Sequence, residues 1–243
     1  MTQQPRRATA AAGLPVRFLR RRIDVWRRRR FACLFVTLIL TLVAAPVLQA
    51  LGRNPSLLKG CVALNLVAAV IGTVDEPGFH PLLALAGVAL VTMAVSAMAG
   101  PGPLLTADQT AWSLVVLLAM ASILRTVLRR GPVDSERIWG ALSVYLLFGI
   151  LCGMIYCLCE QAWPGSLAFA NRTAGAELTL RDTIYFSFVT LASLGYGDIA
   201  PRAGPVQFVA VVEAITGQLY LIVLVARLVS LYDRERERMA GAQ

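Results

Sequence analysis

The hydrophobic positions of the chain are gathered in long runs separated by short polar or Gly/Pro-bearing joints. Six runs approach the roughly 20 apolar residues that a helix rising 1.5 Å per residue needs to cross a bilayer. The second run is the weakest, because Lys59 interrupts it and only 14 uncharged residues follow from Cys61, so an interfacial or re-entrant helix is its alternative. The pattern predicts an all-α membrane protein with six transmembrane helices, at 31–51, 57–74, 82–99, 111–128, 138–159 and 205–231.

A further uncharged segment, 183–197, is too short to cross as a helix and ends in Gly-Tyr-Gly before Asp198. Non-helical backbone at membrane depth is tolerated only where protein or a watery cavity satisfies its polar groups. The segment is therefore expected to enter the membrane and return, lining a pore or a binding cavity. Just before it, Thr179-Leu-Arg-Asp182 fits a capping box with Thr179 as N-cap, which predicts a short helix over 180–192.

Composition agrees with a membrane protein. Of the 243 residues, 57% are hydrophobic and 15% charged, whereas a soluble domain has about a quarter charged. The net charge of +9 lies in residues 1–30, which hold ten arginines and one acid, while the remainder is balanced. A nucleic-acid partner is therefore not expected, and the basic arm is expected to meet anionic lipid headgroups.

Basic residues also predict the orientation, because cytoplasmic flanks are enriched in Arg and Lys. With the N-terminus inside and six spans, the inside flanks hold 18 basic residues and the outside flanks 5. Both termini are thus expected in the cytoplasm, in the cell (inner) membrane. Lys59 is the only lysine among 23 basic residues, which suggests a bacterial gene.

The sequence lacks the usual combinations of catalytic or metal-binding residues. The five cysteines lie in apolar runs, none forms a metal-ligand pair with a histidine, and His80 is the only histidine. Neither an enzyme nor a cofactor or resident metal is expected.

The run Thr190-Leu-Ala-Ser-Leu-Gly-Tyr-Gly-Asp198 resembles the pore signature of potassium channels, whose filter reads T-V-G-Y-G. The resemblance extends from residue 138 onward, whereas the first 130 residues share only the span count. It implies an outer helix, a turret, a pore helix, a filter that binds permeant K⁺, and an inner helix. The residues it assigns are the filter Ser193, Leu194, Gly195, Tyr196 and Gly197, its supports Asp198, Thr190, Tyr185 and Phe186, and a hinge at Gly217.

The residue types suit such a filter. Gly195 and Gly197 adopt positive φ without penalty, so successive carbonyls can point at an ion. Ser193 adds a hydroxyl at the inner end, and the ring of Tyr196 is expected to brace the filter against aromatic side chains. Val189 stands where some relatives carry a glutamate that pairs with the filter aspartate, so Asp198 must find another donor.

One chain carries one filter segment, whereas the filter needs four, so a homotetramer is expected. The chain divides into a basic arm, a four-helix region of unknown use, a pore domain and a short tail, at 1–30, 31–130, 131–232 and 233–243.

Two residues of the last span keep alternative interpretations. Glu213 is an intramembrane acid and hence a candidate functional residue; it is either an anchor bonded to Thr190 or Ser187, or a participant in permeation or pH gating. Gly217 is either a hinge or a site of close helix packing.

The resemblance implies passive flux of potassium. Voltage sensing is not expected, because Arg125, Arg129 and Arg130 lack the three-residue spacing of a sensor and lie at a cytoplasmic helix end. The alternatives are a weakly selective cation channel, since Ser193 and Leu194 replace the usual Thr and Val, a transporter subunit, and a non-conducting membrane adaptor.

Overall fold

The computed structural model describes residues 30–50, 84, 86–92, 95, 103–129, 135–170 and 178–240. The basic arm before residue 30 and the predicted span 57–74 lie outside them, and the predicted span 82–99 is described in part, as helix over 86–92. The elements are α2 (Arg30–Ala50), α5 (Pro103–Leu128), α6 (Ser135–Ala162), β1 (Leu167–Phe169), α7 (Leu180–Leu191), β2 (Ile199–Pro201) and α8 (Gly204–Ala240).

Among these described elements, three helices are long and apolar enough to cross a membrane: Thr106–Leu128, Ser135–Ala162 and Gly204–Arg227. Helix α2 begins and ends within one residue of the predicted first span. The helical fold is confirmed, and the four helices cover the predicted spans, although α5 begins at Pro103 instead of residue 111 and α8 extends to Ala240 instead of ending at residue 231. The count of six spans stays a prediction.

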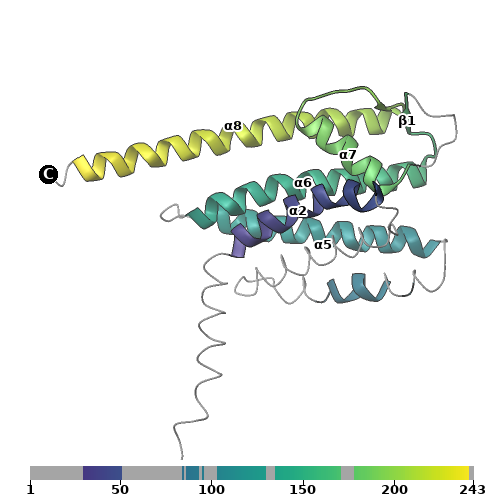
Figure 1. Ribbon diagram of the computed structural model, residues 1–243, viewed down its shortest axis with the longest axis horizontal. Helices are drawn as coiled ribbons and strands as arrows, with labels where there is room; N and C mark the ends of the chain where they lie inside the picture. The colour runs from purple at the N-terminus through teal and green to yellow at the C-terminus, as the bar shows by residue number, and fades with distance from the viewer. Residues whose placement is uncertain are drawn as a thin grey trace, which may run out of the picture.

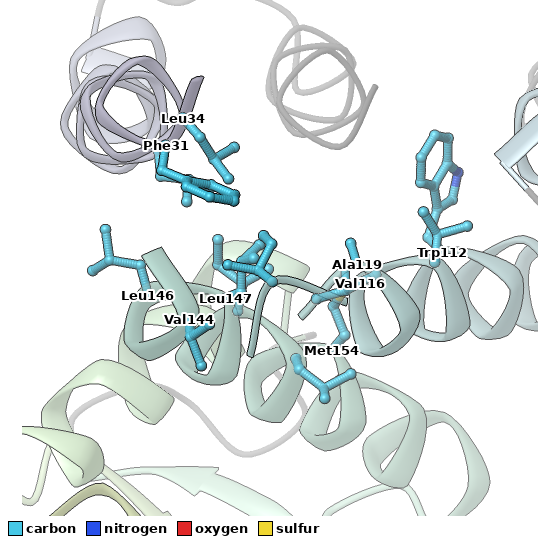
Figure 2. Packing of buried hydrophobic residues seen from close by; sticks show 14 of the residues in the cluster. Phe31, Leu34, Trp112, Val116, Ala119, Val144, Leu146, Leu147 and Met154 are labelled. Atoms are coloured by element: carbon cyan, nitrogen blue, oxygen red, sulfur yellow. The ribbon is translucent and has the colours of Figure 1, made fainter. Parts of the chain in front are cut away.

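Helix α6 is the central element, with α2 and α5 against one side and α7 and α8 against the other (Figure 1). Figure 2 shows Phe31 and Leu34 of α2 facing Leu146 and Leu147 of α6. Val116 of α5 belongs to the same buried cluster. This apolar packing ties the N-terminal helices α2 and α5 to α6, against which α7 also packs.

Two polar contacts hold the same helices at the end where α6 begins. The Phe31 N–H donates to the Glu136 carboxylate at 3.0 Å, and the Arg137 guanidinium donates to the Arg129 carbonyl at 2.8 Å. A cation at a helix C-terminus satisfies carbonyls that the helix leaves without partners. The end of α5 is therefore capped by α6.

A glycine allows α7 to lie directly on α6. A Cβ at Gly153 would meet the Ile184 Cα at 2.6 Å, closer than real Cβ contacts. Because the obstacle is backbone, a side chain here would push the two helices apart.

The all-α prediction omitted a small sheet. Strands β1 and β2 pair antiparallel in the register Leu167↔Pro201, Ala168↔Ala200 and Phe169↔Ile199. The sequence pattern did not indicate them, because three residues give too few positions for an alternation to be recognised. The sheet joins the segment after α6 to the chain immediately following Asp198.

Helix α8 has few contacts within the chain. Only 11% of its most apolar window is buried, against 67% for α6. It runs well past α6 in Figure 1 and continues as helix to Ala240. Its large exposed apolar side chains include Phe208, Val211, Ile215, Leu219, Ile222 and Val223.

Candidate functional site

The site is built on the short helix α7, whose start is capped as predicted. Thr179 has extended backbone angles (φ −90°, ψ 160°) and accepts a hydrogen bond from the Asp182 N–H, while the Asp182 carboxylate accepts from the Thr179 N–H. Burial works to raise the pKa of Asp182, but hydrogen bonds from Thr179 and from the Arg181 guanidinium outweigh it and lower the pKa. The carboxylate is therefore ionised at the positive end of the helix.

The end of α7 turns the chain into the filter segment. The Leu194 N–H donates to the Val189 carbonyl and the Ser193 N–H to the Thr190 carbonyl, both at 2.9 Å. With Ser193 at φ 57°, this is a Schellman motif, in which one left-handed residue reverses the chain after a helix. Ser193 thus belongs to the cap of α7 and is also the first residue of the predicted filter.

Alternate residues of the filter segment have positive φ: Ser193 at 57°, Gly195 at 57° and Gly197 at 75°. The expectation for the two glycines is confirmed. The positive φ of Ser193 was not anticipated; the signal was its place one residue beyond the C-cap, where left-handed backbone is common. All five filter residues are exposed in the single chain.

The outer end of the filter is tied down at Asp198. The Tyr185 hydroxyl donates to the Asp198 carboxylate at 2.8 Å, and the Ile199 N–H donates to its other oxygen at 3.1 Å. Tyr185 is thus the donor that Asp198 needed in place of a residue at position 189. The hydrogen bond to Asp198 is also the main reason why the pKa of Tyr185 is raised, so the phenol keeps its proton.

The other predicted supports have different surroundings. Phe186 is buried and packs edge-on against Tyr156, with ring centroids 4.9 Å apart. The Tyr196 ring is 66% exposed, so the expected bracing against aromatic side chains is not made within one chain. Thr190 is half-buried, and its carbonyl accepts the hydrogen bond from the Ser193 N–H at the end of α7.

Behind α7 lies Glu213, whose side chain is 1% exposed. The Tyr156 hydroxyl donates to one carboxyl oxygen at 2.6 Å, and the other oxygen is hydrogen-bonded to the Ser187 hydroxyl. Of the two partners predicted for Glu213, Thr190 and Ser187, the structure has Ser187. Tyr156 of α6 is a second partner that the sequence did not indicate. The carboxyl joins α6, α7 and α8 at one buried point.

The hydrogen count at this point indicates the protonation state. The Ser187 oxygen also lies 2.7 Å from the Gly149 carbonyl, which can only accept. A serine hydroxyl has one proton to donate. That proton can serve either the Glu213 carboxylate or the Gly149 carbonyl. A neutral Glu213 would satisfy both contacts at once, because its own proton would bond Ser187 while Ser187 bonds Gly149.

Helix α8 meets the inner end of the filter at Gly217 and Gln218. A Cβ at Gly217 would collide with the Leu191 side chain, which supports close packing at this glycine. The next residue, Gln218, donates from its amide to the Ser193 hydroxyl oxygen at 2.6 Å. Sequence reasoning missed Gln218, because no motif marks a contact between residues 25 positions apart.

Within the described part of the chain, no group of three or more His, Cys, Asp or Glu side chains could hold a metal ion.

The comparisons with known proteins agree with this geometry. A family model described as "Ion channel" matches residues 140–234, which include α7, the filter segment and most of α6 and α8. LctB of Bacillus caldotenax is 31% identical over 100 residues, which are 40% of this chain and 74% of LctB. The chain belongs to the ion channel family. It is a membrane channel and not an enzyme.

Two further relatives have shorter shared segments. Two-pore potassium channel 4 of Arabidopsis thaliana is 34% identical over 90 residues, which are 37% of this chain and 27% of the plant protein. LctB of Geobacillus stearothermophilus is 42% identical over 67 residues, 27% of this chain and 48% of that protein. The resemblance to potassium channels is confirmed by the plant relative. No solved structure matches the chain significantly.

Proposed function

We propose that the chain forms a potassium-selective channel, a homotetramer that passes K⁺ passively and without voltage sensing. Residues 193–197 form the filter, K⁺ is the permeant ion, and no cofactor is needed. The channel lies in a bacterial cell membrane with both termini cytoplasmic and the arginine arm against anionic lipid. The observation that carries this proposal is the run of alternating left-handed residues at the end of a capped pore helix.

The backbone angles support ion binding by carbonyls. K⁺ leaves water only where oxygen atoms replace its hydration shell, and filters supply them as rings of backbone carbonyls. Positive φ at Ser193, Gly195 and Gly197 alternates with the ordinary φ of the residues between them. This alternation brings successive carbonyls toward one side of the segment. The C-terminal end of α7, the negative end of its dipole, directly precedes this segment and favours a cation there.

Exposure supports the tetramer. The filter residues and one face of α8 are exposed in the single chain, and bare polar backbone cannot face lipid. Lipid could cover the apolar side chains of α8, but only protein or a water-filled cavity can satisfy the filter. A ring of four chains supplies both the missing carbonyls and the cover for α8.

A weakly selective cation channel is the second candidate, because Ser193 lacks the β-branch that stiffens a threonine at the same place. The ratio of K⁺ to Na⁺ flux separates the two.

The test is flux through the purified protein in liposomes, with native mass spectrometry to count the chains. Gly197→Ala forces a side chain into φ 75°, which costs about 1–2 kcal/mol and distorts the carbonyls. Gly165→Ala is the matched control, since Gly165 has φ 83° in the turn before β1 and nothing within 4 Å of a Cβ.

K⁺-selective flux that is lost in Gly197→Ala and kept in Gly165→Ala is the expected result. Equal K⁺ and Na⁺ flux would establish the weakly selective channel instead. An assembled wild-type protein that passes neither ion would overturn the proposal.

A further inference from the structure

The hydrogen bond between Gln218 and Ser193 joins the inner helix to the innermost residue of the filter segment. The donor is the side-chain amide of α8 and the acceptor is the serine hydroxyl, 2.6 Å away. Both residues are exposed in the single chain, so neither is confined by surrounding side chains. Within one chain, the hydrogen bond is therefore the restraint on the two groups.

Helix α8 is anchored on both sides of Gln218, so the amide is delivered at a defined place. One residue earlier, Gly217 packs against the Leu191 side chain at the end of α7. Two residues later, the Tyr220 hydroxyl donates to the Ala141 carbonyl of α6 at 2.6 Å. A residue between two such anchors cannot shift along the helix axis without breaking one of them.

Ser193 is a residue that needs such a restraint. Its backbone is in the left-handed region at φ 57°, where a non-glycine residue costs about 1–2 kcal/mol. Its side chain has a single heavy atom beyond Cβ, so it lacks the stiff χ1 of a β-branched residue. Without a partner the hydroxyl would be distributed among rotamers, and its oxygen would not be held as a ligand.

The chemistry of the bond suits a cation ligand. A hydroxyl oxygen has two lone pairs and one proton. An amide N–H occupies one lone pair, which fixes the direction of the oxygen and leaves the second lone pair for an ion. A carboxylate at position 218 could not do this, because it would compete for the hydroxyl proton and for the ion itself.

We propose that Gln218 is a positioning residue for the innermost ion site: its amide holds the Ser193 hydroxyl oxygen and thereby sets the K⁺ affinity of that site. The proposal rests on the function proposed above. It assigns to Gln218 no direct contact with the ion.

The experiment measures K⁺ binding by heat stability of the detergent-solubilised tetramer. A ligand that binds only the folded state raises the unfolding temperature with its concentration. In Gln218→Leu, loss of one hydrogen bond should raise the K⁺ concentration that produces a given increase in unfolding temperature about five-fold. Ser193→Ala removes the acceptor of the hydrogen bond. In that background, Gln218→Leu should change the required K⁺ concentration by less than about two-fold.

Gln207→Leu is the matched control. Gln207 is exposed on the same helix, about 16 Å away along its axis, and donates to the Pro201 and Arg202 carbonyls instead. It should leave the K⁺ dependence unchanged. Should Gln218→Leu not assemble, Gln218→Asn replaces it, because the shorter amide stays polar but cannot reach the hydroxyl.

The outcomes separate this inference from the proposed function. Wild-type protein without selective flux would overturn the function. Selective flux in wild type, with equal K⁺ dependence in wild type and Gln218→Leu, would overturn the role of Gln218 alone. If Gln218→Leu weakened K⁺ binding equally in wild type and in Ser193→Ala, the role of Gln218 would also be overturned, because its effect would then not depend on the Ser193 hydroxyl.

Discussion

Replacing Glu213 with glutamine and with leucine tests the proton count where α6, α7 and α8 meet. Ser187 lies within hydrogen-bond distance of both the Glu213 carboxyl and the Gly149 carbonyl. A neutral carboxyl would accept from Tyr156 on one oxygen and donate from the other to Ser187, which would leave the Ser187 proton for Gly149. Glutamine reproduces this pattern, since its carbonyl accepts from Tyr156 and its amide donates to Ser187. Glu213→Gln should therefore change the free energy of unfolding by less than about 1 kcal/mol.

Leucine reproduces none of it. The Tyr156 hydroxyl, in a side chain that is 0% exposed, would lose its acceptor. A buried donor left without a partner costs about 1–3 kcal/mol, and Glu213→Leu should be destabilised by that amount. Adding Tyr156→Phe should recover part of the loss, because it removes the orphaned hydroxyl.

The assay is unfolding in mixed detergent micelles for wild type and the three variants. It is combined with infrared spectra, in which a protonated carboxyl has a C=O stretch that Glu213→Gln removes. If Glu213 were ionised, glutamine would lose two charge-assisted hydrogen bonds and cost about as much as leucine. That result, with no protonated carboxyl band in wild type, would refute the neutral network.

Three further substitutions have defined outcomes. Asp182→Asn should lower stability at neutral pH by about 1 kcal/mol. Since the pKa of Asp182 in the folded protein lies below its ordinary 3.8, the difference from wild type should hold above about pH 4 and decline as the pH falls from there through the lowered pKa, in unfolding measured from pH 6 downward. Tyr185→Phe removes the donor to Asp198 and should lower the free energy of unfolding of the K⁺-bound tetramer by about 1 kcal/mol per chain, seen as a lower unfolding temperature. An unchanged unfolding temperature would show that this hydrogen bond adds no stability. Gly153→Ala should destabilise the protein by about 1–3 kcal/mol in the same unfolding assay, because its Cβ meets the backbone of α7, whereas Gly204→Ala, with nothing within 4 Å, should not.

Features that depend only on neighbours along the chain could be predicted from the amino-acid sequence. The apolar runs predicted α2, α5, α6 and α8, because the length of a span depends only on the helical rise. The capping box at Thr179 and the positive φ of the two filter glycines are equally local, since each depends on a few consecutive residues. The family resemblance is local as well, because it rests on the nine consecutive residues from Thr190 to Asp198.

Contacts between groups far apart in the sequence could be found only from the three-dimensional arrangement of the helices. Asp198 bonds Tyr185, 13 residues away, and Glu213 bonds Tyr156, 57 residues away. The pairing of β1 with β2 and the bond from Gln218 to Ser193 belong to the same class. Each depends on how α6, α7 and α8 cross and on their axial register, which close contacts at glycines such as Gly153 help to set. No periodicity along the chain encodes that register, because it results from side chains packing between helices.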